Sequence, residues 1–271
     1  MSMHDLLTRL DDSAFLGFRV WDFSFRSLRS RYGLTFLGRI MLRHPLKAVA
    51  GILRYGRLLR GRTKQSDITL LHEGAEEDLI SRVVTAKTGL LVAVGFCQKP
   101  LAPRCPAGRP NHDCIFLDEL DLEDEAEPAH QVCVQCDIRA IGIRALLAGA
   151  NMHIMTSAMD IARDVMIPSV DYQRFTKALM CLCPYSIQAI ALPLIICGIE
   201  GFLVGYASGN CMDYQEWLQA DAGTKREMTT LRPGAYEKLL TLLRRLAERR
   251  EKEGLLYVRF ARRGNIYVPI Q

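Results

Sequence analysis

The stretch Leu90-Leu-Val-Ala-Val-Gly-Phe-Cys97 decides how this chain folds. Seven apolar or small residues stand in a row before the cysteine, and polar residues follow it. A short uninterrupted apolar run rich in Leu and Val predicts a buried β-strand rather than a surface helix. We therefore expect a strand over residues 90–96 that ends at Cys97.

Strands and helices are predicted to alternate after this first strand. Further strands are expected at residues 152–156, 177–183 and 202–206, and the helices between them at 137–148, 158–165 and 186–197. Gly149 ends the first of these helices, and Pro168 is expected to lie just beyond the second. Alternation at this spacing argues for parallel strands joined by right-handed crossovers. The predicted fold class is α/β, with a Rossmann-like, mostly parallel sheet and crossover helices.

The rest of the chain flanks this sheet on both sides. Residues 1–89 are predicted to form a basic helical extension, residues 90–224 a cysteine-rich α/β domain, and residues 225–271 a C-terminal helix and small β-hairpin packed on it. The helix is expected at 234–253, after Pro233, and the hairpin at 255–260 and 265–270.

Positive charge is concentrated near the N-terminus. Residues 19–64 contain twelve Lys or Arg and a single acid, Asp22, a net +11 against +5 for the whole chain. Leu42, Leu46, Val49, Leu53 and Leu58 alternate with basic residues at helical spacing, which predicts an amphipathic helix that begins near His44-Pro45. Such a helix can lie on an anionic membrane, an acidic partner or nucleic acid. We favour the simpler interpretation, in which its apolar stripe docks on the main domain.

No export signal is recognisable at the N-terminus, which lacks a basic, then apolar, then small-residue pattern. The most apolar stretch, residues 187–206, is interrupted by Pro193 and several glycines, so we expect a helix, a turn and a strand there rather than a membrane span. We therefore predict a cytoplasmic protein, with peripheral membrane contact through residues 19–64 as an open option. In a reducing compartment disulfides are not expected, and clustered cysteines indicate metal or redox chemistry.

All nine cysteines fall between residues 97 and 211, and five of them lie between 97 and 136 on segments rich in Pro and Gly. Cys133-Val-Gln-Cys136 is a C-x-x-C at the start of a predicted helix, where backbone N–H groups favour thiolates. His130, three residues earlier, offers a further ligand. The candidate metal ligands are Cys97, Cys105, Cys114, Cys133, Cys136, Cys183, Cys211 and His130.

Three of these cysteines, Cys97, Cys183 and Cys211, lie at or just after predicted strand ends. Ligands of parallel sheets gather beyond the carboxyl ends of the strands, so we expect these thiols at one edge of the sheet. Cys181 and Cys197 lie in apolar runs and are interpreted as packing residues. His153 is expected in the core, and Asp160, Arg139, Arg144 and Asp213 are candidate groups around the metal or substrate.

The cysteine pattern resembles a cysteine-rich family of bacteria and archaea, domain of unknown function 116. The matching motifs are Cys97, Cys105-Pro-Ala-Gly108, Cys133-x-x-Cys136-x-Ile138, Cys183-Pro-Tyr185 and Asn210-Cys211-Met-Asp213, over residues 90–220. His130 stands where the family has a cysteine, Thr156-Ser157-Ala158 replaces a Pro-Gly-x-Ser turn, and Asn210-Cys211 replaces Gly-Cys. The resemblance implies a thiolate-bound metal, with iron–sulfur as the expected form, and no agreed reaction.

The ligand pattern favours iron–sulfur over zinc. A structural zinc site shows two close ligand pairs, whereas this chain has one C-x-x-C and otherwise dispersed cysteines, which clusters accept. We expect one 4Fe-4S cluster, or two, in an enzyme or a redox or sulfur-handling accessory that acts on a small molecule. A redox or radical-enzyme protein is the expected partner, and nucleic acid is not. The alternative is a zinc-stabilised binding module that docks an anionic partner through its basic N-terminal helices.

Overall fold

The computed structural model describes residues 26, 30–60, 68–72, 75–85, 89–124 and 130–271. Their centre is an eight-stranded mixed sheet of order β1-β5-β4-β2-β3-β8-β7, with β6 paired to β5 outside this path. The strands are β1 (Ile68–Leu70), β2 (Leu90–Gly95), β3 (Asn151–Met155), β4 (Lys177–Leu182), β5 (Glu200–Ser208), β6 (Thr230–Leu231), β7 (Arg259–Arg263) and β8 (Ile266–Ile270).

The four central strands, β5-β4-β2-β3, are parallel, which confirms the predicted α/β class. β2 is buried along its whole length, as its apolar sequence predicts for a strand covered on both faces. The first connection leads from β2 outward to β3, and the next returns past β2 to β4. Strand order therefore reverses between β2 and β4, and doubly wound sheets bind ligands beyond the strand ends at such a reversal.

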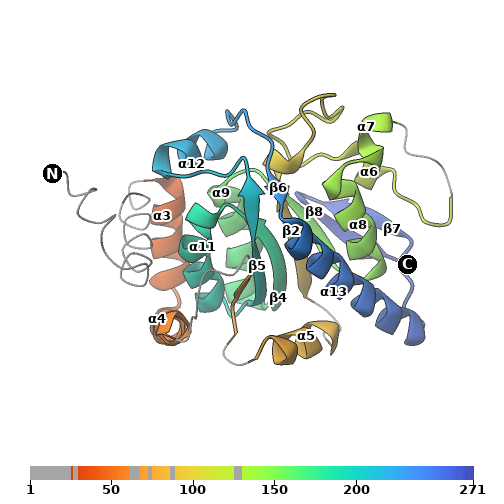
Figure 1. Ribbon diagram of the computed structural model, residues 1–271. Helices are drawn as coiled ribbons and strands as arrows, with labels where there is room; N and C mark the ends of the chain where they lie inside the picture. The colour runs from red at the N-terminus through yellow and green to blue at the C-terminus, as the bar shows by residue number, and fades with distance from the viewer. Residues whose placement is uncertain (1–25, 27–29, 61–67, 73–74, 86–88, 125–129) are drawn as a thin grey trace.

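Helices cover both faces of the sheet (Figure 1). On one face α13 (Pro233–Lys252) packs against α5 (Glu76–Thr85) and α8 (Asp137–Leu147). The other face carries α3 (Arg31–Thr35), η1 (Phe36–Met41), α4 (Pro45–Arg60), α9 (Ala158–Asp160), η3 (Ile161–Met166), α10 (Ile167–Tyr172) and α11 (Pro184–Ile196). Short elements gather at the upper edge in Figure 1, namely η2 (Phe96–Gln98), α6 (Ile115–Asp118), α7 (Gln131–Val134) and α12 (Tyr214–Asp221).

The helix after β3 does not stop before Pro168, so that prediction was wrong. It runs through one π-helical segment, η3, into α10, and ends at Gln173 in the left-handed conformation. Pro168 takes one of the first two positions of α10, where a missing N–H costs little. Because the π-helical segment ends at Met166 and a new α-helix begins at Ile167, Pro168 stands at the start of a helix rather than in the middle of one.

The amphipathic helix predicted from Pro45 is present as α4, but its orientation differs from the favoured interpretation. The face that packs on α11 consists of small or aromatic residues, Ala48, Gly51 and Tyr55. A Cβ on Gly51 would lie 2.8 Å from the backbone of Ile196, so glycine permits this close approach. Most of the predicted stripe, namely Leu42, Leu46, Val49 and Leu53, is exposed, and only Leu58 packs on the core.

One sheet runs through all three predicted segments of the chain. β1, which the sequence did not predict, comes from residues 1–89 and pairs antiparallel with β5. The predicted C-terminal hairpin is confirmed as β7–β8, and β8 pairs antiparallel with β3. Residues 187–206 form the expected helix, turn and strand, and none of the helices in the described ranges is both long and apolar enough to cross a bilayer. Residues 19–25 and 27–29 of the basic extension lie outside those ranges.

Candidate metal centre

The candidate ligands divide into two groups at the carboxyl edge of the sheet rather than meeting at one point. Cys105, Cys114, Cys133 and Cys136 line one cavity, which we call the four-cysteine cavity. Cys97, Cys183 and Cys211 approach one another at the strand ends, and we call them the three-cysteine group. The sequence predicted that Cys97, Cys183 and Cys211 lie together at the sheet edge, but it did not predict a separate site for the other four.

The four-cysteine cavity is built from segments that hold little regular structure. Its sulfur atoms come from the loop after η2, from the residue before α6, from α7 and from the residue before α8. The cavity is small and partly open to solvent, and its other walls include Phe116, Val132 and Ile138. Four thiols in a mainly apolar wall form a donor set suited to thiophilic metals or clusters.

Lys99 lines this cavity and binds the backbone of the loop that carries Cys105 and Cys114. Its side chain is 1% exposed, and its ammonium donates to the backbone oxygens of Gly108, Asn111 and Asp113 at 2.6 to 3.1 Å, as well as to Asn111 Oδ1. Burial lowers the pKa of Lys99, while the nearby Cys105 and Cys114 thiols act in the opposite direction. A buried ammonium beside several thiols offsets the negative charge that thiolates would bring.

Two of the four thiols stand at helix starts. Cys136 precedes α8, and backbone hydrogen bonds from Ile138 and Arg139 act to lower its pKa, although burial outweighs them and raises it. Burial likewise raises the pKa of Cys114, before α6, to about 12, against the backbone hydrogen bond from Leu117. These thiols are protonated as they stand, and a bound metal would displace the protons.

Arg139 supplies an unused hydrogen-bond donor in the cavity wall. Its guanidinium lies 5.0 Å over the ring of Phe116, and it acts to lower the pKa of Cys133. Its Nε is buried and has no hydrogen-bond partner among the described residues. Buried donors are rarely left unpaired, so this one is available to a group bound in the cavity.

The four thiols lie around the cavity and do not converge on one position where a single metal ion could bind. Among the described residues no three His, Cys, Asp or Glu side chains are close enough to hold one metal ion. A tetrahedral zinc with sulfur at about 2.3 Å needs sulfur atoms about 4 Å apart. The space between the walls admits little more than a water molecule, so a larger cluster requires these walls to separate. His130 is exposed at the start of α7 and is not part of the cavity wall.

The three-cysteine group occupies the reversal point of the sheet. Cys97 follows β2, Cys183 follows β4, and Cys211 follows β5, as the sequence predicted for thiols at one edge. The backbone N–H of Cys211 donates to Cys183 Sγ at 3.3 Å, and the charge of Cys183 acts to raise the pKa of Cys97. All three side chains are buried.

Lys225 faces these thiols directly. Its ammonium lies 3.3 Å from Cys211 Sγ and 3.8 Å from Cys183 Sγ. A hydrogen bond from Cys183 and the charge of Lys225 lower the pKa of Cys211, while the same hydrogen bond and burial raise that of Cys183. Burial acts to lower the pKa of Lys225, but the thiols outweigh it and raise it. Cys211 is therefore the thiol most readily ionised in this group.

Polar groups surround Cys97 on its other side. Thr229 donates from Oγ1 to Cys97 Sγ at 3.2 Å, and its backbone N–H donates to the Cys97 carbonyl. Tyr206 donates to Gln98 Oε1 and accepts from the Gly95 N–H. Gln98 Nε2 is buried without a hydrogen-bond partner in the part of the chain that the structure describes. This second unused donor lies beside the reversal point, where a ligand would bind.

Arg109 joins the two groups. Its guanidinium donates to four backbone carbonyls, those of Cys97, Lys99, Lys225 and Glu227. The loop between Cys105 and Cys114 is thereby fastened to the end of β2 and to the segment that carries Lys225. The two sulfur groups share one scaffold.

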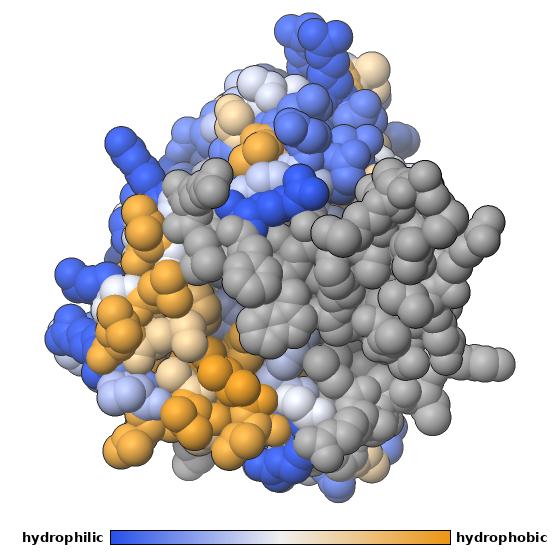
Figure 2. Space-filling model, turned by 90° about the vertical axis from the view of Figure 1, so that its left-hand side faces the viewer, coloured by the Kyte–Doolittle hydropathy of each residue, from blue (hydrophilic) through white to orange (hydrophobic). Residues whose placement is uncertain are grey.

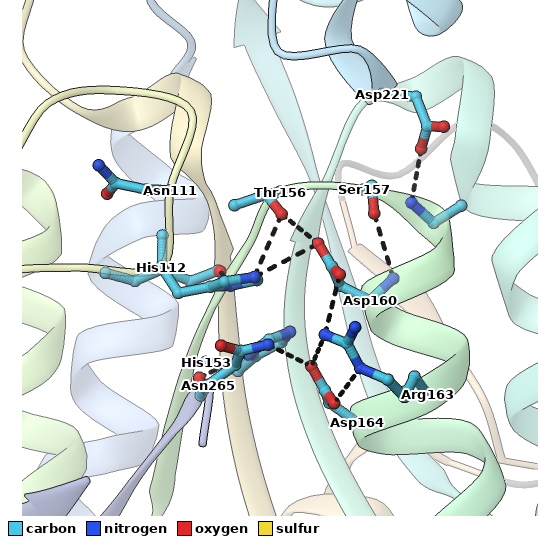
Figure 3. Close-up of polar contacts among 12 residues, drawn as sticks. Asn111, His112, His153, Thr156, Ser157, Asp160, Arg163, Asp164, Asp221 and Asn265 are labelled. Atoms are coloured by element: carbon cyan, nitrogen blue, oxygen red, sulfur yellow. Dashed lines mark hydrogen bonds and ion pairs between the residues drawn. The ribbon is translucent and has the colours of Figure 1, made fainter. Parts of the chain in front are cut away.

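A polar network underlies the same edge near β3 (Figure 3). His112 Nδ1 lies 2.7 Å from the Ile154 carbonyl, and His112 Nε2 lies 3.4 Å from Asp160, which also accepts from Thr156. Burial would raise the pKa of Asp160, but hydrogen bonds from His112 and Thr156 hold it below its usual range. His112 therefore ties the cysteine-bearing loop to β3 and is not part of the cavity wall.

The remaining candidates have structural surroundings. Cys181 and Cys197 are buried in the hydrophobic core, and burial raises the pKa of each to about 12. His153 is fully buried, as expected for a core histidine, with Nδ1 at 3.0 Å from the Asn265 carbonyl, whereas its Nε2 has no hydrogen-bond partner among the described residues. Asp213 caps α12 by accepting from the Glu216 N–H. Arg144 donates to a carbonyl of its own helix.

Sequence reasoning missed four residues that build the site, namely Lys99, Arg109, Lys225 and Thr229. Lys99 and Arg109 could have been suspected, because a lone lysine two residues after a buried strand and an arginine within a Pro–Gly loop lie beside predicted ligands. Lys225 and Thr229 lie in a polar stretch without periodicity and give no signal of their own. Comparison of the chain with protein-family models, curated proteins and solved structures gave no match. The resemblance to domain of unknown function 116 stays a prediction.

Proposed function

We propose that this chain is an iron–sulfur protein whose cluster, of the 4Fe-4S type, is held by Cys105, Cys114, Cys133 and Cys136. The observation that supports the proposal is the four-cysteine cavity itself, in which thiols from four chain segments face one space. Because these thiols do not converge on one point, a cluster, in which each thiolate binds a different iron, suits them better than a single metal ion, provided that the cavity walls separate to admit it.

The charges around the cavity support the same assignment. Four thiolates and a cluster carry net negative charge, and Lys99 and Arg139 supply positive charge beside them. The unpaired Nε of Arg139 provides a donor for a cluster sulfide or a thiolate. A bound cluster of this type would supply one-electron transfer.

The three-cysteine group is the place where we propose that a small molecule is handled. It lies at the sheet reversal, with the Cys211 thiol beside the Lys225 ammonium and the unpaired Gln98 amide nearby. In this arrangement Lys225 stabilises a thiolate, and Gln98 is available to orient a polar ligand. Three thiols can also hold a second cluster with one open iron, and the protein then acts as an enzyme or as a redox or sulfur-handling accessory.

The free thiols support a cytoplasmic location and a redox partner for this protein. Nine reduced cysteines fit the cytoplasm, and a one-electron centre implies a redox or radical-enzyme protein as partner.

Anaerobic purification of the full chain tests the cluster. We expect a brown protein with bound iron and an equal amount of acid-labile sulfide. The double variant Cys105→Ser/Cys136→Ser should lose the iron held in the four-cysteine cavity, whereas the matched control Cys197→Ser, which changes a core thiol, should keep it. An iron content in the double variant equal to that of the wild type, or no iron in the wild type, would overturn the proposal.

The zinc-stabilised binding module is the second candidate, and the outward apolar face of α4 favours it as a docking element. The same preparation separates the two. A colourless protein with stoichiometric zinc, lost in the Cys105→Ser/Cys136→Ser variant, would replace the iron–sulfur proposal with this one.

A further inference from the structure

We propose that the outward face of α4 docks the protein on a membrane surface that contains anionic lipids. This inference is independent of the metal centre and rests on the side chains that α4 turns away from the core. Because Ala48, Gly51 and Tyr55 hold the helix against the body of the protein, its opposite side is fixed outward rather than free to bury itself.

The outward side of α4 is apolar. Leu46, Val49 and Leu53 are 85%, 58% and 62% exposed, and their spacing of three and four residues places them on one line along the helix. Leu42, 78% exposed, lies in the turn just before α4. Figure 2 shows this surface as a continuous hydrophobic patch. Exposed apolar side chains in a continuous row are costly in water and mark an interaction surface.

The surroundings of the patch are basic. Arg39, Arg43, Lys47 and Arg57 are exposed beside it, and the sequence from residue 31 to residue 60 contains no Asp or Glu. Asp171, which pairs with His44 and Arg43 near the start of α4, is itself only 8% exposed. The patch therefore presents apolar groups within a positive rim.

This combination matches an anionic lipid surface. An interfacial helix inserts its apolar side chains at the level of the headgroups, while Lys and Arg contact lipid phosphates and carboxylates. The helix, of 16 residues or about 24 Å, lies along the molecular surface, and its fixed docking allows it to lie flat on a bilayer. Tyr172, 80% exposed at the end of α10, follows Asp171 and adds an aromatic side chain suited to the headgroup region.

A second copy of this chain fits the patch less well. A two-fold interface would bring the same surface from each copy together and would place two basic rims against each other. An anionic bilayer supplies negative charge instead.

Vesicle co-sedimentation of the full chain tests the proposal. We expect binding to vesicles of phosphatidylcholine with phosphatidylserine, weaker binding to phosphatidylcholine alone, and weakening by high salt. The variant Leu46→Glu/Leu53→Glu should reduce binding by about tenfold or more, since it places two carboxylates in the inserted face. Leu256→Glu, which changes another leucine that is 57% exposed, is the matched control and should bind as the wild type does.

Each other outcome overturns the proposal. Equal binding of Leu46→Glu/Leu53→Glu and wild type would show that α4 is not the contact surface, provided that circular dichroism shows both folded. Absence of vesicle binding would exclude the lipid surface. A dimer in solution that this variant dissociates, without vesicle binding, would assign the patch to a second copy.

Discussion

Two buried lysines, one in each sulfur group, show how different the two groups are. Lys99 donates to four oxygen atoms of one loop, whereas the hydrogen-bond partners of the Lys225 ammonium among the described residues are the sulfur atoms of Cys183 and Cys211. The first lysine fixes backbone, and the second balances thiol charge. A buried cation thus serves either structure or chemistry according to the atoms that it contacts.

Replacing each lysine by methionine is the strongest test of this difference. Lys99→Met leaves several buried carbonyls without a donor and should lower the free energy of unfolding by about 3 kcal/mol or more. Lys225→Met removes a charge from sulfur atoms, which are weak acceptors, and should cost less than about 1 kcal/mol. Urea unfolding measures both, with the exposed Lys252→Met as control. Equal losses of unfolding free energy in Lys99→Met and Lys225→Met would contradict the claim that the two lysines have different roles.

Low pH should destabilise the four-cysteine side more than the three-cysteine group, because the buried His153 contacts His112 in the loop between Cys105 and Cys114. Burial lowers the pKa of His153 to about 4, from about 6.5 in an unfolded chain. Between these values the unfolded chain binds more protons, so stability falls as the pH drops from 6.5 to 4, by roughly 3 kcal/mol from this group. His153→Asn, which keeps a donor for the Asn265 carbonyl, should remove this part of the acid sensitivity.

The location of the acid effect can also be measured. His153 stacks on His112, which binds the cysteine-bearing loop to β3. Hydrogen exchange at acid pH should therefore rise in residues 105–114 before it rises in residues 183–211. Exchange that rises first at the strand-end cysteines would contradict this order.

The smallest effect is expected at the surface of the four-cysteine loop. Arg262 pairs with Asp113 at 2.5 Å, but both side chains are well exposed to solvent. Exposed ion pairs contribute little, so Arg262→Ala should lower stability by about 0.5 kcal/mol, measured by thermal unfolding. Arg263→Ala, at the neighbouring exposed position, is the control. A loss above about 2 kcal/mol would show that the hairpin supports the cavity more strongly than the ion pair accounts for.

The sheet was predictable where apolar runs are long enough to require burial. β2 and β4 were predicted to within a residue because their runs are continuous. β1 has three residues and β6 two, too short to give a pattern, and their pairing with β5 is decided by tertiary contacts. The apolar stripe of α4 was found, but its direction was not, because the small residues Ala48 and Gly51 carry the contact and periodicity gives weight to the leucines.

Most cysteines of the site could be named from the sequence, but their division into the four-cysteine cavity and the three-cysteine group could not be predicted. Strand-end position placed Cys97, Cys183 and Cys211 together, since parallel strands share one carboxyl edge. The spacing of Cys105, Cys114 and Cys133 has no such rule, because the path of an irregular loop depends on distant contacts such as the hydrogen bonds of Lys99. His130 shows the limit, since its spacing from Cys133 fits a ligand and its side chain is exposed.

Arg109 has a consequence for any attempt to engineer this protein. Because one guanidinium donates to four carbonyls in two stretches far apart in the sequence, residues 97–99 and 225–227, the cysteine-bearing loop cannot be shortened, exchanged or transplanted as a separable module. Its removal would release the returning peptide at residues 225–227 as well as the turn after β2. The loop therefore holds the edge of the sheet together in addition to carrying candidate metal ligands.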